Sequence, residues 1–253
     1  MSVPLDPWSR LRHATRARIG LGRSGDALPT EALLDFQQAH ALARDAVHSA
    51  VDFPALTADL APLTCLHVAS QAADRSIYLR RPDLGRRLAA DADLPRGDWD
   101  AVFVIADGLS ASAVMDQAAP TLRACLARLP GWKLAPVVLA SQARVALGDD
   151  IGERMGARLS VVLIGERPGL SVANSLGIYL TWEPRVGRKD SERNCLSNIH
   201  ADGLSHEVAA EKLTWLMTEA VRRRLTGVAL KENADALPTA SRDDRVIVGL
   251  CDE

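Results

Sequence analysis

Two short segments of the chain carry residue types that could bind a small molecule. The first is Gly165-Glu-Arg-Pro-Gly169, which follows an apolar run ending at residue 164. Such a run predicts a buried strand, and open α/β sheets bind ligands beyond the carboxyl ends of their strands. The two glycines let backbone approach a ligand closely, and Pro168 stiffens the loop. The position of Glu166 therefore predicts a carboxylate that faces a ligand.

The second segment, residues 193–203, places Cys195, Asn198 and His200 shortly before a predicted helix. The start of a helix favours polar and anionic ligands, so a ligand-contacting loop is one interpretation. A hydrogen-bonded loop with one buried thiol is the other, and composition does not choose between them. Asp107, at the end of another predicted strand, also has two interpretations: it could face the ligand crevice or cap the following helix.

A sheet must position these segments, and the apolar pattern from about residue 99 onward predicts one. Predicted strands alternate with predicted helices, which is typical of an α/β fold with a Rossmann-like, mostly parallel sheet and flanking helices. The strands are expected at 101–106, 134–140, 159–164 and 176–182, and the helices at 111–129 and 148–157. A polar loop is expected over 183–204, followed by a last helix over 205–225.

The N-terminal part has a different character. A helix is predicted over 31–51, with Thr30 as its N-cap and Glu31 in its first turn, and a less regular helical tract over 62–80. The predicted organisation is therefore a basic irregular segment (1–30), a helical subdomain (31–95), an α/β domain (96–231) and a polar tail (232–253).

Bulk properties exclude several classes of protein. A net charge of −2 argues against binding nucleic acid through its phosphates. The four cysteines lie far apart with no C-x-x-C pair, which favours reduced thiols in the cytosol over disulfides or a zinc site. No secretory signal and no apolar run long enough to cross a bilayer is visible. We therefore expect a soluble intracellular protein with no nucleic-acid or membrane partner.

Common catalytic motifs fit poorly. Gly20-Leu-Gly-Arg-Ser-Gly25 matches G-x-G-x-x-G, but a basic stretch rather than a strand precedes it, and Pro29 separates it from the next helix. A basic loop is the preferred interpretation, and a stand-alone Rossmann-like nucleotide-binding oxidoreductase is the alternative function. A ligand-free interaction module of a metabolic compartment is a third hypothesis. No G-x-S-x-G elbow occurs, and Ser110 is predicted to cap a helix.

Three motifs together resemble one known family. They are Gly165-Glu-Arg-Pro-Gly169, Cys195-Leu-Ser-Asn-Ile-His200 and the N-terminal stretch 18–48. In order and spacing, from about residue 8 to residue 231, the chain resembles the small (light) subunit of ethanolamine ammonia-lyase. The resemblance implies an adenosylcobalamin-dependent, radical-forming enzyme that converts ethanolamine into acetaldehyde and ammonia. It also implies a large-subunit partner, which supplies most of the binding site for ethanolamine. This chain is therefore not expected to be active alone.

The resemblance also implies which residues contact the cofactor. Val145, Glu166 and Cys195 match cobalamin-contacting positions, and none of them is expected to act as a catalytic acid or base. The chain has no D-x-H-x-x-G motif at His200, so no cobalt ligand is expected and His200 is interpreted as a polar or structural group. The expected location is the cytoplasm, either free or inside a bacterial microcompartment.

Overall fold

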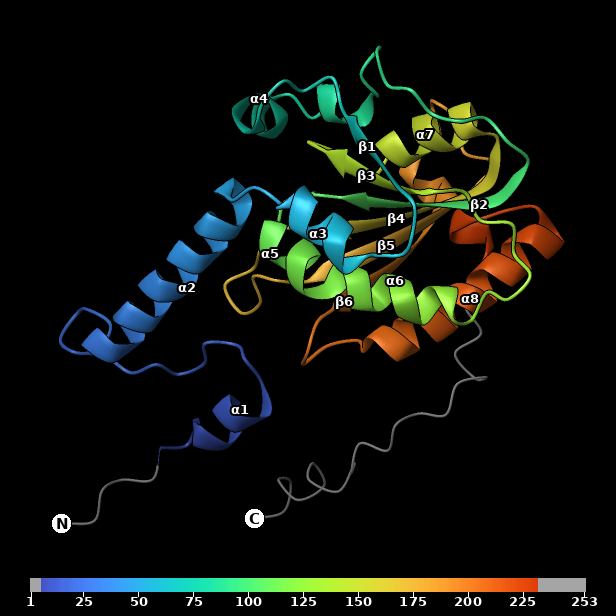
Figure 1. Cartoon of the computed structure of the whole chain (residues 1–253). Coiled ribbons are helices and arrows are strands. Elements are labelled where there is room, and N and C mark those ends of the chain that lie inside the picture. The colour runs from blue at the N-terminus through green and yellow to red at the C-terminus, as the bar shows by residue number, and fades with distance from the viewer. Residues whose placement is uncertain (1–5, 232–253) are drawn as a thin grey trace, which may run out of the picture.

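The computed structural model describes residues 6–231, and a six-stranded mixed sheet lies at its centre (Figure 1). The strands are β1 (Cys65–Ala69), β2 (Trp99–Ala106), β3 (Val137–Ser141), β4 (Ala157–Gly165), β5 (Leu176–Trp182) and β6 (Arg193–Ile199). Their order in the sheet is β1-β3-β2-β4-β5-β6. The first four run parallel, whereas β5 is antiparallel to β4 and β6 is antiparallel to β5. The predicted α/β class is confirmed.

The lengths of the connections explain the change of direction within the sheet. The chain passes from β2 to its neighbour β3, and from β3 past β2 to β4, through helices, which is how parallel strands are usually joined. Residues 166–175 join β4 to β5 without a helix, so β5 folds back antiparallel along β4. The loop that carries Glu166 is this turn.

Helices cover both faces of the sheet (Figure 1). One face carries α3 (Phe53–Asp59), a helix formed by α5 (Ala111–Ala113), η2 (Val114–Ala118) and α6 (Ala119–Leu126), and α8 (His206–Arg223). The other carries α4 (Arg75–Arg80), the short turn η1 (Leu84–Arg86) and α7 (Leu147–Met155). Alternate strand residues point to opposite faces, so Phe103 belongs to one core cluster and Val104 to the other. A short turn, η3 (Asp190–Glu192), directly precedes β6. A second short turn, η4 (Gly227–Ala229), follows α8.

Local sequence signals account for several helix boundaries. The predicted cap at Ser110 is confirmed, because its hydroxyl accepts a hydrogen bond from the Ala113 amide at 3.1 Å. Ser205 caps α8 in the same way. The predicted N-cap at Thr30 is wrong by one position: Pro29 precedes the helix and Thr30 is its first residue.

Two expectations for irregular parts of the sequence are wrong. Residues 62–80 are not one helical tract, because Cys65–Ala69 form β1 and pair along β3 before α4 begins. Residues 183–204 are not wholly a loop, because Arg193–Ile199 form the edge strand β6. Both strands lie at an edge of the sheet and pair with a single neighbour. β1 is fixed by pairing with β3, which is distant in the sequence. β6 pairs with the preceding strand β5, but it is largely polar and has no apolar run that would predict a strand.

The first 43 described residues extend away from the sheet and its helices (Figure 1). This arm, residues 6–48, contains α1 (Ser9–Ala14), a connecting loop and α2 (Thr30–His48). The expected polar tail over 232–253 lies outside the described residues. Within 6–231, no helix combines the length and apolar character needed to span a bilayer.

Candidate functional site

The three residues expected to contact a cofactor come together at one edge of the sheet. Val145 lies in the turn after β3, Glu166 directly follows β4, and Cys195 lies in β6. They line two adjoining hollows. The Cys195 hollow, about 330 Å³, and the Glu166 hollow, about 250 Å³, share Arg144, Val145 and Tyr179 in their walls. Val145 and Tyr179 therefore lie between Cys195 and Glu166.

Tyr179 of β5 connects the two hollows. It pairs with Cys195 across the β5–β6 ladder, and both side chains line the Cys195 hollow. Burial, together with the Glu166 carboxylate and Cys195 beside it, raises the pKa of Tyr179. Burial also raises the pKa of the Cys195 thiol. Both groups are therefore neutral near pH 7, and Cys195 offers a thiol contact rather than a nucleophilic thiolate.

The Glu166 carboxylate is held by groups from two other segments. Its Oε2 atom accepts hydrogen bonds from the Ser175 hydroxyl at 2.5 Å and from the Asn198 amide at 3.2 Å. A Cβ atom placed on Gly177 would lie 3.0 Å from Oε1, so the absence of a side chain there makes room for the carboxylate. No donor within the described residues reaches Oε1. That oxygen is free to accept a hydrogen bond from a ligand.

Asp107 shapes the turn that carries Val145. Its buried carboxylate accepts hydrogen bonds from the amides of Gln142 and Ala143, both at 2.8 Å, and from the Gly108 amide at 2.9 Å. Gln142 has a φ of 52°, a backbone conformation that needs such support. Asp107 therefore caps the turn after β3. The helix-cap interpretation is wrong, because Ser110 caps the helix that follows.

Tyr78 lies between two arginines beside the Glu166 hollow. The guanidinium carbon of Arg144 is 4.3 Å from the centre of the Tyr78 ring, and that of Arg75 is 4.8 Å away. The Tyr78 hydroxyl donates to the carbonyl of Ala143 at 3.1 Å. Burial raises the pKa of Tyr78 to about 12, against the opposing effect of the two cations. Three buried polar atoms around this ring and the turn beside it, Arg75 Nη2, Arg144 Nε and Gln142 Oε1, have no partner within the described residues.

A buried ion pair lies beside the Cys195 hollow, which Arg193 helps to line. Arg193 Nη1 lies 2.6 Å from Asp149 Oδ1, and the two side chains are 2% and 1% exposed. The same guanidinium donates to the Thr181 hydroxyl at 3.1 Å and to the Arg188 carbonyl at 2.9 Å. This network joins the start of α7 to β5 and β6. It fixes the strand that presents Cys195, and its charges are internally compensated.

His200 is a structural group, as interpreted from the sequence. Its Nε2 atom lies 2.9 Å from Asn198 Oδ1, while Nδ1 accepts from the Asp202 amide at 3.2 Å. Both ring nitrogens thus hold the turn after β6. The Gly20–Gly25 segment also agrees with its expected role as a loop, because it joins α1 to α2 with no strand before it. The thiols of Cys65, Cys125 and Cys195 are free, and Cys251 lies outside the described residues.

The sequence did not point to Arg144, Tyr179 or Ser175, although each contributes to the hollows or holds Glu166. Tyr179 carries one usable signal. It carries a hydroxyl within an otherwise apolar run, and strand alternation places it on the side opposite to Ile178 and Leu180. Arg144 carries none, because its role depends on the turn that Asp107 creates.

Comparisons with known proteins give the family. The family model described as "Ethanolamine ammonia-lyase light chain (EutC)" matches residues 5–231. The chain is 53% identical over 242 residues to the "Ethanolamine ammonia-lyase small subunit" of Azotobacter vinelandii, covering 91% of this chain and 90% of that one. It is 49% identical over 257 residues to the Pseudomonas syringae pv. tomato protein of the same name, covering 96% and 88%. This chain belongs to the ethanolamine ammonia-lyase light chain family.

Proposed function

We propose that this chain forms one wall of an adenosylcobalamin site and that the large subunit of ethanolamine ammonia-lyase completes it. The observation that carries the proposal is the convergence of Val145, Glu166 and Cys195 on two hollows with shared walls. These residues come from three different strand ends or strands, so their meeting depends on the fold. The hollows are open surfaces of this chain, which suits a cofactor that is covered from the other side by a partner.

The chemistry of the hollows fits cobalamin. A corrin ring is apolar across its face and carries amide side chains around its rim. Glu166 Oε1 can accept a hydrogen bond from a rim amide, while Val145, the Tyr179 ring and the neutral Cys195 thiol offer contacts to less polar parts. The unpartnered Arg144 Nε is a buried donor beside both hollows, and a rim amide carbonyl would satisfy it.

In the proposed assembly, the residues of this chain bind, orient and shield. When bound, adenosylcobalamin supplies the radical chemistry by which the complete enzyme converts ethanolamine into acetaldehyde and ammonia. Glu166 is held by Ser175 and Asn198 and therefore fixes the position of the group that it binds. None of the three contact residues serves as a catalytic acid or base, and ethanolamine binds mainly to the large subunit. The isolated chain is accordingly inactive as an ammonia-lyase.

The experiment is a cobalamin titration of the assembled large and small subunits, followed by the absorbance of bound cobalamin. Glu166→Ala should raise the cobalamin concentration at half-saturation roughly tenfold or more, since a hydrogen bond to a charged group contributes about 1.5–3 kcal/mol. Cys195→Ala should have a smaller effect, because it removes only a neutral contact. Glu211→Ala, on the exposed surface of α8, is the matched control and should change nothing. An unchanged titration curve for Glu166→Ala would refute the proposed site.

A further inference from the structure

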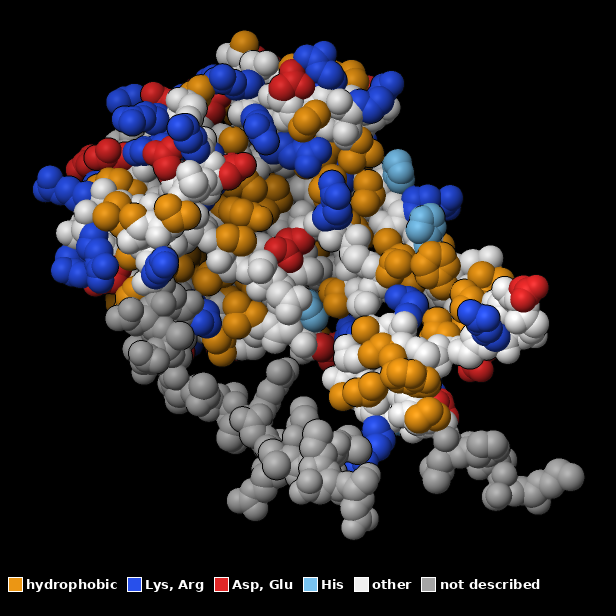
Figure 2. All heavy atoms as spheres, turned by 180° about the vertical axis from the view of Figure 1, so that it is seen from behind, with side chains coloured by type: hydrophobic (Ala, Val, Ile, Leu, Met, Phe, Trp, Pro, Cys, Tyr) orange, Lys and Arg blue, Asp and Glu red, His pale blue; other side chains and the backbone are white. Residues whose placement is uncertain are grey.

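The arm carries an unusual share of the exposed apolar surface. Seven of the eleven large apolar side chains that are exposed within the described residues lie between residues 6 and 48. They are Trp8, Leu11, Leu28, Leu33, Leu34, Phe36 and Leu42. Figure 2 shows apolar groups at several places on the arm. Exposed apolar side chains concentrated on one segment in this way are typical of a protein–protein contact.

The arm has almost no core of its own. Helix α2 is 19 residues long, and Ala46, near its junction with the body, is its one buried residue. Helix α1 has no buried residue. An isolated helix of this length gains little stability from propensity alone and normally needs an apolar face to pack against. The fold of the arm is therefore incomplete without another surface.

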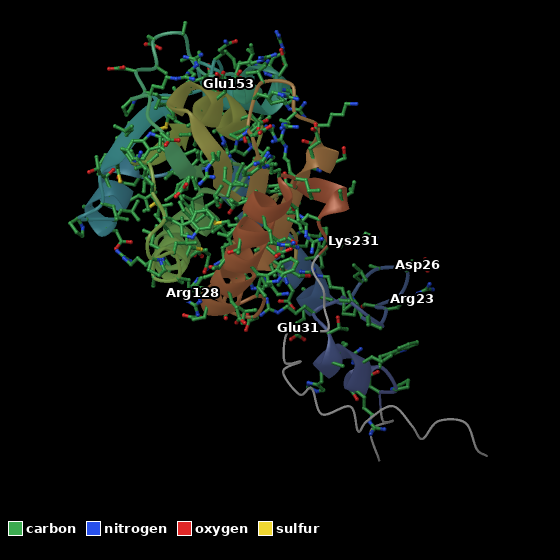
Figure 3. The ribbon with its side chains drawn as sticks, turned by 90° about the vertical axis from the view of Figure 1, so that its right-hand side faces the viewer. Arg23, Asp26, Glu31, Arg128, Glu153 and Lys231 are labelled. Carbon is green, nitrogen blue, oxygen red and sulfur yellow. The ribbon has the colours of Figure 1, made fainter. Side chains whose placement is uncertain are left out.

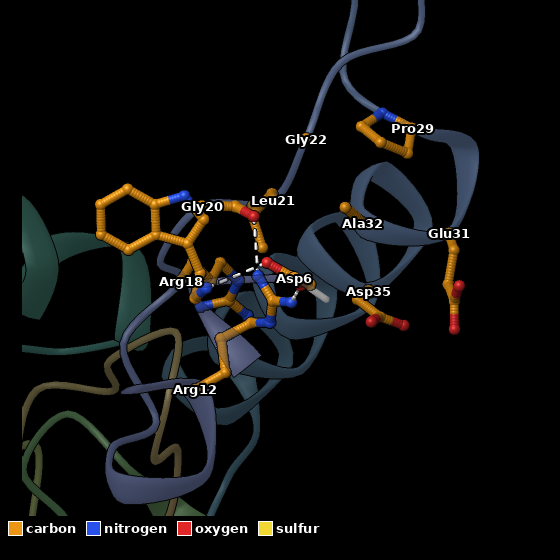
Figure 4. Close-up of a pocket in the computed structure, with 11 residues that line it drawn as sticks. Asp6, Arg12, Arg18, Gly20, Leu21, Gly22, Pro29, Glu31, Ala32 and Asp35 are labelled. Atoms are coloured by element: carbon orange, nitrogen blue, oxygen red, sulfur yellow. Dashed lines mark hydrogen bonds and ion pairs between the residues drawn. The ribbon is translucent and has the colours of Figure 1, made fainter. Parts of the chain in front are cut away.

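The arm also presents a groove that is already shaped. A hollow of about 540 Å³ lies between α2 and the loop that precedes it, and Figure 4 shows the residues that line it. Arg12 holds that loop by donating to the carbonyls of Ile19 at 3.2 Å and Gly20 at 2.7 Å, and it pairs with Asp6. Apolar groups of Trp8, Leu21, Pro29 and Ala32 line the hollow, and charged groups of both signs surround it.

The charge of the arm favours a protein as its occupant. Residues 6–48 contain six arginines and five acidic residues, so the arm is nearly neutral. Binding to nucleic acid or to an anionic membrane depends on a marked excess of basic side chains. Figure 3 shows Arg23 and Asp26 together at the outer end of the arm, pointing away from the body. A rim of mixed charges around an apolar centre is the usual composition of a protein interface.

The position of the arm identifies which protein it meets. Strands β2 and β3 point toward the side of the molecule from which the arm extends (Figure 1). Arg18 donates to the Leu170 carbonyl at 3.3 Å, and Arg16 donates to the Ser171 carbonyl at 3.4 Å and pairs with Asp202. These partners lie in the Glu166 loop and in the turn that His200 holds. A protein that covers the candidate cofactor site therefore stands beside the arm.

We propose that the arm is the surface by which this chain grips the large subunit, with apolar side chains of that subunit covering α2 and entering the groove. This inference rests on the proposed function, because it takes the large subunit as the protein that closes the site. A second copy of this chain is the competing occupant. It fits less well, because a self-contact through the arm would leave the adjoining site uncovered.

The test uses full-length chains and measures their association with the large subunit by sedimentation. In the double variant Leu34→Gln and Leu42→Gln, two side chains that are 57% and 56% exposed become polar without loss of a helix-forming residue. We expect the Kd for the large subunit to rise at least tenfold, as for removal of central apolar contacts. The unfolding midpoint of the free chain should not change. Val186→Gln with Val228→Gln, two exposed positions outside the arm, is the matched control and should bind normally.

Each other outcome overturns the inference. A double variant that binds the large subunit as tightly as the unaltered chain would show that the arm is not the grip. Loss of self-association in the free chain, with normal binding to the large subunit, would assign the arm to a second copy. If the unaltered chain itself does not bind the large subunit, the proposed function fails as well, which distinguishes the two failures.

Discussion

The arm and the α/β body show two ways in which the same chain uses apolar residues. In the body, Phe103 and its neighbours are buried on both faces of a sheet, so the structure there is complete without a partner. In the arm, side chains of the same type face outward from helices with almost no core. Apolar content alone therefore does not indicate a core. The body holds the residues of the candidate site in place, and the arm offers exposed apolar surface for contact with a partner.

A matched pair of phenylalanines tests this difference most strongly. Phe103 is 1% exposed and Phe36 is 39% exposed. Phe103→Ala should lower the free energy of unfolding by about 3–5 kcal/mol, because it leaves a cavity in the core. Phe36→Ala should change it by about 0.5 kcal/mol or less, as for an exposed site. Urea unfolding of the free chains measures both. Equal losses would mean that the arm has a core like that of the body.

A matched pair of aspartates gives the next largest effect. Asp107→Ala in the body leaves the buried amides of Gln142 and Ala143 without an acceptor, at a cost of about 2–4 kcal/mol. Asp6 in the arm also accepts a backbone hydrogen bond, from Trp8 at 3.0 Å, but it is half exposed and water can replace it. Asp6→Ala should therefore cost less than about 1 kcal/mol. Urea unfolding of both variants decides, and an Asp107 variant as stable as the unaltered chain would contradict the role given to that turn.

The same division explains what could be predicted from the sequence. Buried strands such as β2 and β4 are apolar runs in the sequence, and the helix after β2 begins with a local cap, Ser110. These elements could therefore be predicted. The edge strands β1 and β6 were not, because the partner of β1 is distant in the sequence and β6 is largely polar, with no apolar run to mark it. Of the candidate site, Glu166 followed from its place after a strand, whereas Val145 and Cys195 came from family resemblance. Tyr179 and Arg144 needed the structure, because tertiary contacts alone bring them to the hollows.

Tyr78 tests the junction between the two regions. Its neighbour Arg75 donates to the carbonyl of Val47 in the arm at 2.7 Å and to that of Gly108 in the body at 2.8 Å. Burial raises the pKa of Tyr78 to about 12, above the ordinary value of about 10. Below the ordinary value both folded and unfolded states hold a neutral phenol, so the stability is fully present. Between the two values the unfolded state ionises first, so stability is lost as the pH rises.

The loss attributable to Tyr78 is about 2–3 kcal/mol once the pH exceeds the folded pKa. Urea unfolding across the alkaline range should show a shallower decline for Tyr78→Phe than for the unaltered chain. Phenolate absorbance reports the ionisation directly, because the chain has only two tyrosines and the pKa of Tyr179 is also raised. The spectrum of Tyr179→Phe isolates Tyr78. Ionisation of Tyr78 in the folded chain at its ordinary pKa would show that the junction is open to water, like the arm.

The smallest expected effect concerns communication between the arm and the site. Arg16 and Arg18 contact Leu170, Ser171 and Asp202, and these contacts are exposed. Exposed charged contacts contribute about 0–1 kcal/mol each, so Arg16→Ala with Arg18→Ala should barely change global unfolding. Opening of the Glu166 loop requires less free energy than global unfolding, so its amide exchange is a more sensitive measurement.

In the double arginine variant, hydrogen exchange at the Glu166 and Gly169 amides should be about two- to fivefold faster, which corresponds to roughly 0.5–1 kcal/mol. These amides bond to the Ser175 and Val172 carbonyls within the loop, so they report its closure. Arg23→Ala, at the outer end of the arm, is the matched control and should leave both rates unchanged. Equal rates in all three proteins would mean that the arm and the site are independent. A difference confined to the double variant would mean that the contacts of Arg16 and Arg18 stabilise the loop that holds Glu166, so that the arm and the site are coupled.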